Sequence, residues 1–169
     1  MLGVPLDHIA IHVADRAAAE RVVRELLGHQ AVQELAVHGP DGTAHLGVMA
    51  QPGDRFRLVL CDADEATHPI ARWVASRGPG VHHMAHRVDQ VETALQQIAD
   101  TGAVVGAIVE APGLRQVFVE VADDGMLHEI TQRTGETGFV EENTAALIEA
   151  GADRHNGPPP SAPWRPDRR

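Results

Sequence analysis

Two histidines at matching positions of an internal repeat are the side chains best placed to bind a metal ion. Residues 6–15 read LDHIAIHVAD and residues 81–90 read VHHMAHRVDQ, and an offset of 75 residues aligns His8 with His83. Both segments alternate as strands do, so side chains two positions apart share a face. If the two related strands pair about a twofold axis, the two imidazoles converge, and imidazole is a common ligand of transition metals.

Glu129 is a third candidate ligand. It lies in the segment MLHEITQ, which also alternates like a strand and places Glu129 between Leu127 and Thr131 on one face. Burying a carboxylate without a partner is unfavourable, so an inward-facing Glu129 is best explained by a bound cation. Two histidines and one carboxylate on one side of a metal leave positions open for substrate and dioxygen, the arrangement typical of non-haem iron(II) oxygenases.

A helix is predicted directly after each of the two histidine-bearing strands. Apolar residues at helical spacing place these helices at 16–27 and about 90–101. The N-cap positions fall to Asp15 and Asp89, and the C-terminal ends to Gly28 and Gly102. Further helices are predicted at 65–77 and about 140–150.

Three short strands are predicted after each of the two helices, because turn sequences rich in Gly, Pro and Asp separate apolar segments. The strands cover about 31–38, 43–50, 55–61, 103–109, 114–121 and 126–132. The chain is therefore predicted to be an α+β protein of two tandem βαβββ modules, at about 5–62 and 80–133, within a single domain at 1–150. The segment 151–169 is proline-rich and is predicted to form an extended tail.

The composition excludes several classes of function. The 169 residues carry a net charge of −10, which disfavours nucleic acid as a partner, since its binding depends on a basic surface. All 14 basic residues are arginines and tyrosine is absent, so neither a lysine Schiff base nor a tyrosine acid is available. Cys61 is the single cysteine, which excludes an intrachain disulfide. No apolar run approaches the ~20 residues of a membrane span, so we expect a cytoplasmic protein with no membrane partner.

The doubled module, with DHIAIHV and HHMAHRVD in its first strands, resembles the vicinal oxygen chelate superfamily over residues 6–133. The resemblance implies a cupped mixed sheet around one divalent metal, with His8, His83 and Glu129 as ligands. In many members a fourth ligand stands at the position that corresponds to about Val59, and valine cannot bind a metal. The resemblance also implies an enzyme that acts on a small molecule, and a homodimer as the expected assembly.

Two branches of this superfamily are similar to different parts of the chain. LHEITQRTGETGFVEENTAALIEA, LRQVF and GPGVHHMA resemble the catalytic domain of the 4-hydroxyphenylpyruvate dioxygenases. That resemblance implies Fe(2+), a place for Gln116 in the substrate pocket, and a lid helix at about 138–150 whose segment carries Phe139 and Asn143. PIARWVASRGPGVHHMAHRVD instead resembles the methylmalonyl-CoA epimerases, which implies Co(2+), Mn(2+) or Zn(2+) and no redox chemistry.

The favoured hypothesis is a mononuclear non-haem iron(II) dioxygenase that acts on a small 2-oxo acid or a related oxygen-chelating substrate, with dioxygen as its second substrate. The alternative is a metal-dependent epimerase or lyase, in which the metal polarises a carbonyl and a carboxylate moves an α-proton. Glu34 is a candidate for that base. A metal-free binding protein is a third class, which the intact set of His8, His83 and Glu129 disfavours.

Four other histidines and one arginine lie on the same strands as the candidate ligands. His12 shares the ligand face of its strand and is interpreted as a substrate contact or a support for the ligands. Arg87 is its counterpart in the repeat and could hold a substrate carboxylate at two points. Strand alternation predicts that His82, His86 and His128 point away from the ligand face, as structural or interface residues.

Overall fold

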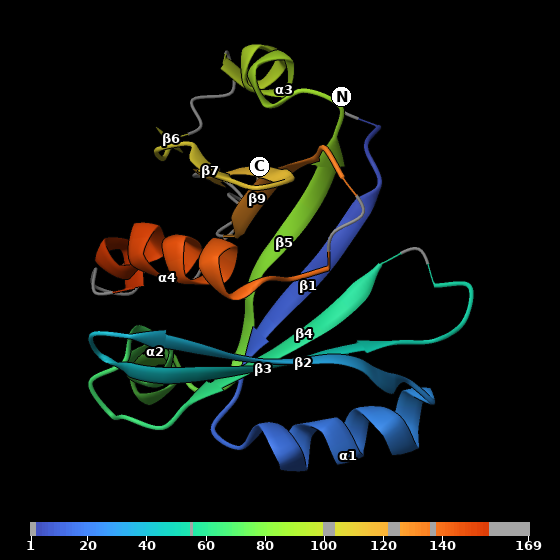
Figure 1. The fold of residues 1–169 in the computed structure, drawn as a ribbon, viewed down its shortest axis with the longest axis vertical. Helices are drawn as coiled ribbons and strands as arrows, with labels where there is room; N and C mark the ends of the chain where they lie inside the picture. Colours follow the sequence, from blue (N-terminus) through green and yellow to red (C-terminus); the bar gives the residue numbers. More distant parts are fainter. Residues whose placement is uncertain (1–2, 55, 100–103, 122–125, 136–137, 156–169) are drawn as a thin grey trace, which may run out of the picture.

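The fold is built on one curled, mixed sheet with helices packed against it (Figure 1). The computed structural model describes residues 3–54, 56–99, 104–121, 126–135 and 138–155. The strands are β1 (Leu6–His12), β2 (Gln30–Gly39), β3 (Gly42–Ala50), β4 (Arg57–Ala63), β5 (Gly80–Val88), β6 (Val104–Val105), β7 (Val109–Ala111), β8 (Leu114–Glu120) and β9 (Leu127–Arg133). The helices are α1 (Arg16–Leu27), α2 (Pro69–Arg77), α3 (Val91–Ile98) and α4 (Glu141–His155).

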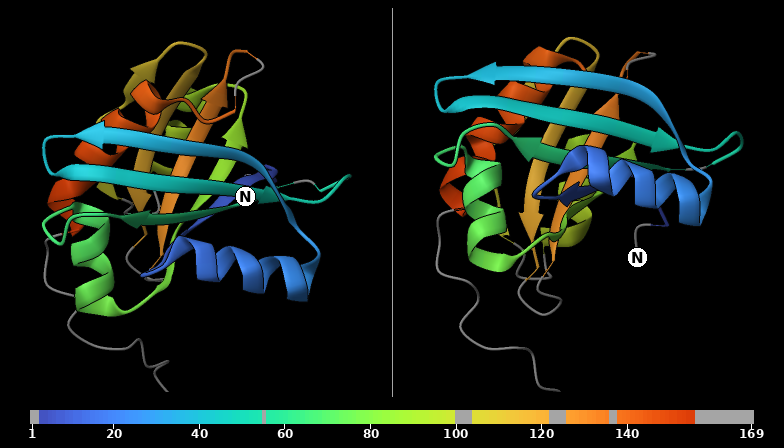
Figure 2. Two further views of the ribbon diagram at one scale, coloured as in Figure 1. Left: turned by 60° about the horizontal axis from the view of Figure 1, so that its bottom comes forward. Right: turned by 90° about the horizontal axis from the view of Figure 1, so that it is seen from below.

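The order of the strands confirms the predicted α+β fold of two βαβββ modules. Across the sheet they run β2-β3-β4-β1-β5-β9-β8-β6, and β7 pairs with β8. β1 and β5 are antiparallel neighbours at the centre, whereas β1 pairs with β4 and β5 pairs with β9 in parallel. Figure 2 shows β2, β3 and β4 running across β8 and β9, so the sheet curls around a concave face.

The strand register preserves the internal repeat. The antiparallel pairing of β1 with β5 relates the two modules by an approximate twofold axis. Within the modules, Ala10 pairs with Val59 and Ala85 pairs with Glu129, in both cases between parallel strands. Because Ala10 and Ala85 are equivalent in the repeat, Val59 is the counterpart of Glu129.

The first helix forms within its predicted bounds. Asp15 accepts a hydrogen bond at 2.8 Å from the backbone N–H three residues later, as an N-cap does. Gly28 ends α1 with a φ of 71°, a left-handed conformation that glycine adopts without steric strain.

The helix that follows β5, α3, departs from the prediction at its N-terminus. Asp89 is not the N-cap; that position belongs to Gln90, whose side chain makes no capping bond. Instead, the backbone N–H of Val91 donates to Gln132 Oε1 of β9 at 3.2 Å, so a neighbouring strand satisfies the helix end. The C-terminal position predicted for Gly102 lies outside the described residues.

Three other elements differ from their predicted bounds. α2 begins at Pro69 rather than at 65, because proline suits the first helical turn and disfavours helix in the residue before it. The strand predicted at 103–109 is divided into β6 and β7, with Gly106 between them, where glycine weakens a strand. α4 ends at His155 rather than at 150, so 151–155 is helical and not extended. Residues 156–169 of the predicted tail lie outside the described ranges.

Each module has a hydrophobic core, and α4 packs on the core of the first. That core contains buried residues of β2, β3 and β4 together with Phe139, and Ala145 and Ile148 of α4 pack against it. The second core joins Val91 and Ala94 of α3 to buried residues of β8 and β9. α4 therefore lies across the concave space between the two halves of the sheet (Figure 1).

No helix within the described ranges is long and apolar enough to cross a membrane. The cytoplasmic location, the homodimer and the domain boundaries at 1–150 stay predictions.

Candidate metal centre

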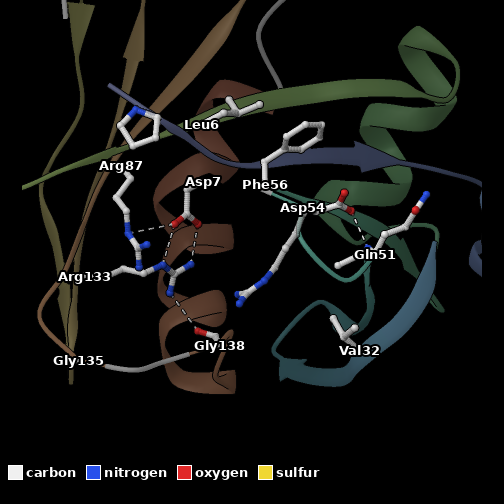
Figure 3. Close-up of a pocket in the computed structure, with 13 residues that line it drawn as sticks. Leu6, Asp7, Val32, Gln51, Asp54, Phe56, Arg87, Arg133, Gly135 and Gly138 are labelled. Atoms are coloured by element: carbon white, nitrogen blue, oxygen red, sulfur yellow. Dashed lines mark hydrogen bonds and ion pairs between the residues drawn. The ribbon is translucent and has the colours of Figure 1, made fainter. Parts of the chain in front are cut away.

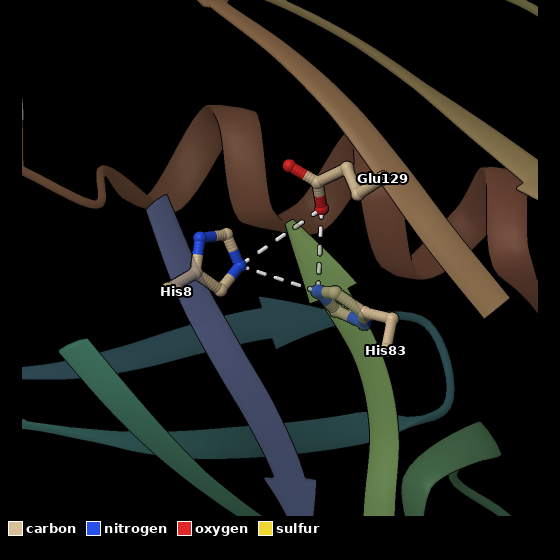
Figure 4. Close-up of side chains that lie close together, drawn as sticks. All are labelled: His8, His83 and Glu129. Carbon is tan, nitrogen blue, oxygen red and sulfur yellow. Dashed lines mark hydrogen bonds and ion pairs between the residues drawn. The ribbon is translucent and has the colours of Figure 1, made fainter. Parts of the chain in front are cut away.

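Three side chains from three adjacent strands meet on the concave face of the sheet (Figure 4). His8 comes from β1, His83 from β5 and Glu129 from β9, and each is at most 9 % exposed. The Nε2 atoms of His8 and His83 lie 3.2 Å apart. Glu129 Oε2 lies 3.3 Å from His83 Nε2 and 4.0 Å from His8 Nε2. The structure thus brings together the side chains predicted as metal ligands.

The protonation of His8 follows from its second hydrogen bond. His8 Nδ1 lies 3.0 Å from Asp7 Oδ1, and because an ionised carboxylate can only accept, Nδ1 carries the proton. The pKa of Asp7 lies well below its usual range: burial raises it, but hydrogen bonds from Arg133 and His8 outweigh that effect. The lone pair of His8 Nε2 therefore points toward His83 and Glu129, in the form that binds a metal.

Glu129 presents one oxygen to the same point. Its Oε1 accepts a hydrogen bond from Gln116 Nε2 at 2.6 Å and another from the Thr131 hydroxyl. The buried Oε2 accepts no hydrogen bond of good geometry from the described residues. Burial raises the pKa of Glu129, but the neighbouring imidazoles of His83 and His8 lower it to about 2. Burial also lowers the pKa of His83. An ionised carboxylate and neutral imidazoles converging in a buried site suit a divalent cation.

Two β-bulges aim further side chains at this site. The register between β1 and β5 shifts at two points, and the extra residues are Asp7 in β1 and His82 in β5. Each lies directly before a candidate ligand, and a bulge re-aims the side chain of its extra residue. His82 Nδ1 consequently lies 2.8 Å from His83 Nδ1, and its ring stacks on His12 with centroids 4.2 Å apart. The prediction that His82 points away from the ligand face is wrong, because alternation fails at a bulge.

Arg133 connects the site to the segment before α4 (Figure 3). Its Nη2 and Nε donate to Asp7 Oδ1 and Oδ2 at 2.7 and 2.9 Å, and its Nη1 donates to the carbonyl of Gly138 at 3.2 Å. The Arg133 side chain is 3 % exposed, so this is a buried ion pair with two contacts. His8, Asp7, Arg133 and the Gly138 backbone therefore form one connected set of hydrogen bonds.

A pocket of about 60 Å³ adjoins the three candidate ligands. His12 and Phe139 line it, and the centroid of the Phe139 ring lies 4.9 Å from that of His8. Gln116 is buried and donates to Glu129, but it does not line the pocket, so its position suits holding Glu129 in place. Substrate contacts of these three residues stay predictions.

Arg87 lies outside this pocket. Its Nε is 3.7 Å from Asp7 Oδ2, and its half-exposed side chain lines a wider groove of about 710 Å³ (Figure 3). The Nε2 atom of His86 lies 2.9 Å from Nδ1 of His128. Neither residue lines the pocket beside the candidate ligands, in agreement with their predicted orientation. The side chain of Asn143 lies outside the described residues, so its predicted role is untested.

Gln33 is a residue near the site that the sequence did not single out. From β2 it donates through Nε2 to the carbonyl of Phe139 and accepts from the Phe139 N–H at 3.1 Å. The two residues are 106 positions apart, so no local pattern could reveal this clamp. Asp7 and His82, by contrast, occupy equivalent positions in the 75-residue repeat, each directly before a candidate histidine ligand. That alignment could have marked both residues as neighbours of the site.

Most of the chain matches the model of a known protein family. Residues 7–118 match the Glyoxalase/Bleomycin resistance protein/Dioxygenase superfamily. The chain belongs to this superfamily. The matched range includes both candidate histidine ligands and ends before β9, which carries Glu129.

Three solved structures show the similarity of fold within and beyond this range. Methylmalonyl-CoA epimerase from Mycobacterium tuberculosis is 25 % identical, with a TM-score of 0.65 over 80 % of this chain and 95 % of the other. A 4-hydroxymandelate synthase mutant from Streptomyces coelicolor is 18 % identical, with a TM-score of 0.75 over 90 % of this chain and 56 % of the other. A hypothetical protein from Bacillus halodurans C-125 is 21 % identical, with a TM-score of 0.66 over 81 % of this chain and 99 % of the other. No curated protein sequence is significantly similar to this chain.

Replacing Asp7 with asparagine is expected to weaken divalent-metal binding by this superfamily member about 10- to 100-fold, the usual effect of changing a ligand's hydrogen-bond partner. The neutral amide accepts more weakly from His8 Nδ1 and leaves the buried charge of Arg133 unbalanced. Competition with a chelator measures the affinity. Asp64→Asn is the matched control, because Asp64 lies 3.0 Å from His45 in an exposed pair and neither residue lines the pocket. Equal metal affinities for the two variants would contradict the role given to Asp7.

Proposed function

We propose that the protein is a mononuclear non-haem iron(II) dioxygenase acting on a small 2-oxo acid, with His8, His83 and Glu129 as the metal ligands. The observation that carries the proposal is that Val59 stands where a fourth protein ligand would be. A set of two histidines and one carboxylate leaves coordination positions for a chelating substrate and for dioxygen. The chemistry that iron(II) supplies when bound is activation of dioxygen and polarisation of the keto acid.

The side chains around the ligands would keep the site in one geometry. Gln116 and Thr131 hold Glu129 Oε1, which leaves Oε2 directed at the histidines. Asp7 keeps the proton of His8 on Nδ1. Phe139 packs edge-on against His8 and is 8 % exposed, so it excludes water from one side of the pocket. Exclusion of water strengthens electrostatic interactions and limits side reactions.

The epimerase hypothesis has support from the likeness to methylmalonyl-CoA epimerase. An epimerase of this type requires a carboxylate base beside the metal, and the residues that line the pocket do not supply a free one. Glu34, the candidate base, has a 66 % exposed side chain near Arg16 and does not line the pocket. Glu129 is the one carboxylate among the described residues that line the pocket, and it belongs to the ligand set. A Co(2+), Mn(2+) or Zn(2+) epimerase is therefore the second candidate.

Metal analysis combined with an oxygen electrode tests the proposal. We expect the protein loaded with iron(II) to consume oxygen only when a 2-oxo acid is present, because the substrate completes the coordination. Zinc-loaded protein is the control, since zinc has no redox chemistry. Bound metal without substrate-dependent uptake for any 2-oxo acid, together with α-proton exchange, would favour the epimerase. Absence of metal binding would contradict both.

A further inference from the structure

The twofold relation between the modules gives each residue around Glu129 a counterpart in the first module. In the second module, Gln116 of β8 pairs with Thr131 of β9, and both side chains donate to Glu129. The equivalent pair in the first module is Leu46 of β3 with Cys61 of β4. They flank Val59, the counterpart of Glu129, so the polar set of one module is replaced by an apolar set in the other.

This apolar set forms one wall of the pocket beside the candidate ligands. The wall consists of Leu46, Val59, Cys61, Ile70, Leu147 and Ile148. Burial and the nearby charge of Asp62 raise the pKa of the Cys61 thiol to about 12, so it stays neutral. The pocket thus has a polar side, which holds His8, His83 and Glu129, and an apolar side formed by β3, β4, α2 and α4.

The size of the pocket limits what the apolar wall can bind. Its volume of about 60 Å³ is room for about four to six water-sized atoms, since one water needs ~10–15 Å³. The same space also has to hold the keto acid group beside the candidate ligands, so it suits a short alkyl side chain better than a larger hydroxyphenyl group. The aliphatic side chains of the wall offer a phenol hydroxyl no hydrogen-bond partner to replace those it has in water. Thr144 of α4 also lines the pocket, but its hydroxyl already donates to the carbonyl of Val140 at 3.0 Å.

We propose that this wall binds the side chain of the substrate and selects a short aliphatic 2-oxo acid over an aromatic one. The inference rests on the proposed function, because the keto acid group is placed at the metal. If the keto acid group is held at the metal that His8, His83 and Glu129 would bind, the side chain of the substrate would face the wall that includes Leu46 and Val59. Apolar contact with a shaped wall then discriminates by size, at about 10- to 200-fold per methylene-sized difference.

Binding to zinc-loaded protein tests the inference without oxygen chemistry. The probes are 4-methyl-2-oxopentanoate, pyruvate and phenylpyruvate, measured by calorimetry. We expect 4-methyl-2-oxopentanoate to bind about tenfold or more tightly than pyruvate, which lacks the alkyl chain, and than phenylpyruvate. Equal or tighter binding of phenylpyruvate, or no binding of any 2-oxo acid, would overturn the proposal.

Leu46→Ala enlarges the pocket at the wall itself. It should raise the affinity for phenylpyruvate relative to 4-methyl-2-oxopentanoate by about tenfold. Leu26→Ala is the control, because Leu26 is 77 % exposed on α1, and it should leave the ratio unchanged. If Leu46→Ala fails to fold, Val59→Ala enlarges the same pocket by a smaller amount and tests the same expectation. An unchanged ratio in the folded variant refutes the role of the wall.

The two proposals fail in different ways. An aliphatic preference in the zinc-loaded protein without oxygen uptake in the iron-loaded protein would refute the dioxygenase and leave the wall intact. Oxygen uptake with aromatic but not aliphatic 2-oxo acids would refute the wall and leave the dioxygenase intact.

Discussion

Alanine at His8, His83 or Glu129 is expected to lower the affinity for iron(II) by about 100-fold or more, because loss of a hydrogen-bond partner of a ligand alone costs 10- to 100-fold. Each change removes one of the three lone pairs that converge within 4.8 Å of one another. Metal content after gel filtration measures the loss. Thermal unfolding gives a second measure, since a cation that binds the native state raises its melting temperature and should no longer do so in the variants.

His38→Ala is the matched control for the two histidine changes. His38 lies on β2, is exposed, and contacts Thr43 rather than the pocket. It should retain the metal content and the metal-dependent rise in melting temperature of the parent protein. Stoichiometric metal in both His8→Ala and His83→Ala would show that the ligand assignment is wrong.

Much of the fold was predictable because the repeat and the local patterns agree. The 75-residue offset that aligns His8 with His83 requires two similar modules, and the central β1–β5 pairing brings the two histidines together. Asp15 and Gly28 mark the ends of α1 by local chemistry that needs no tertiary contact. The position of Val59 also follows from the repeat, since equivalent strands keep equivalent registers.

The parts that sequence could not predict depend on strand irregularity and on contacts between distant residues. Alternation places His82 on the outer face, and the bulge in β5 turns it inward. Asp7 and Arg133 are 126 positions apart, and their ion pair exists because the N-terminus of β1 and the C-terminus of β9 lie at the same end of the sheet, on either side of β5. A pattern read along the chain carries no information on such pairs.

Val59→Glu is expected to suppress 2-oxo-acid-dependent oxygen uptake by about 100-fold while metal remains bound, because a fourth protein ligand occupies a position that substrate or dioxygen needs. The introduced carboxylate mirrors Glu129 across the twofold axis. Its neighbours Leu46 and Cys61 lack the strong donors that Gln116 and Thr131 provide to Glu129. Without metal it is therefore a poorly compensated buried charge, and with metal it is a ligand.

This asymmetry predicts two opposite effects in one variant. The metal-free Val59→Glu protein should be less stable than the parent, and its metal-dependent rise in melting temperature should be larger. Val59→Leu is the control, because it adds similar bulk without a ligand atom, so any loss of uptake that it shares with Val59→Glu comes from crowding of the pocket. The dioxygenase proposal fails if Val59→Glu binds metal yet consumes oxygen like the parent. It also fails if cobalt(II) supports α-proton exchange in the parent protein while iron(II) supports no oxygen uptake, because a redox-independent epimerase then explains the same three ligands.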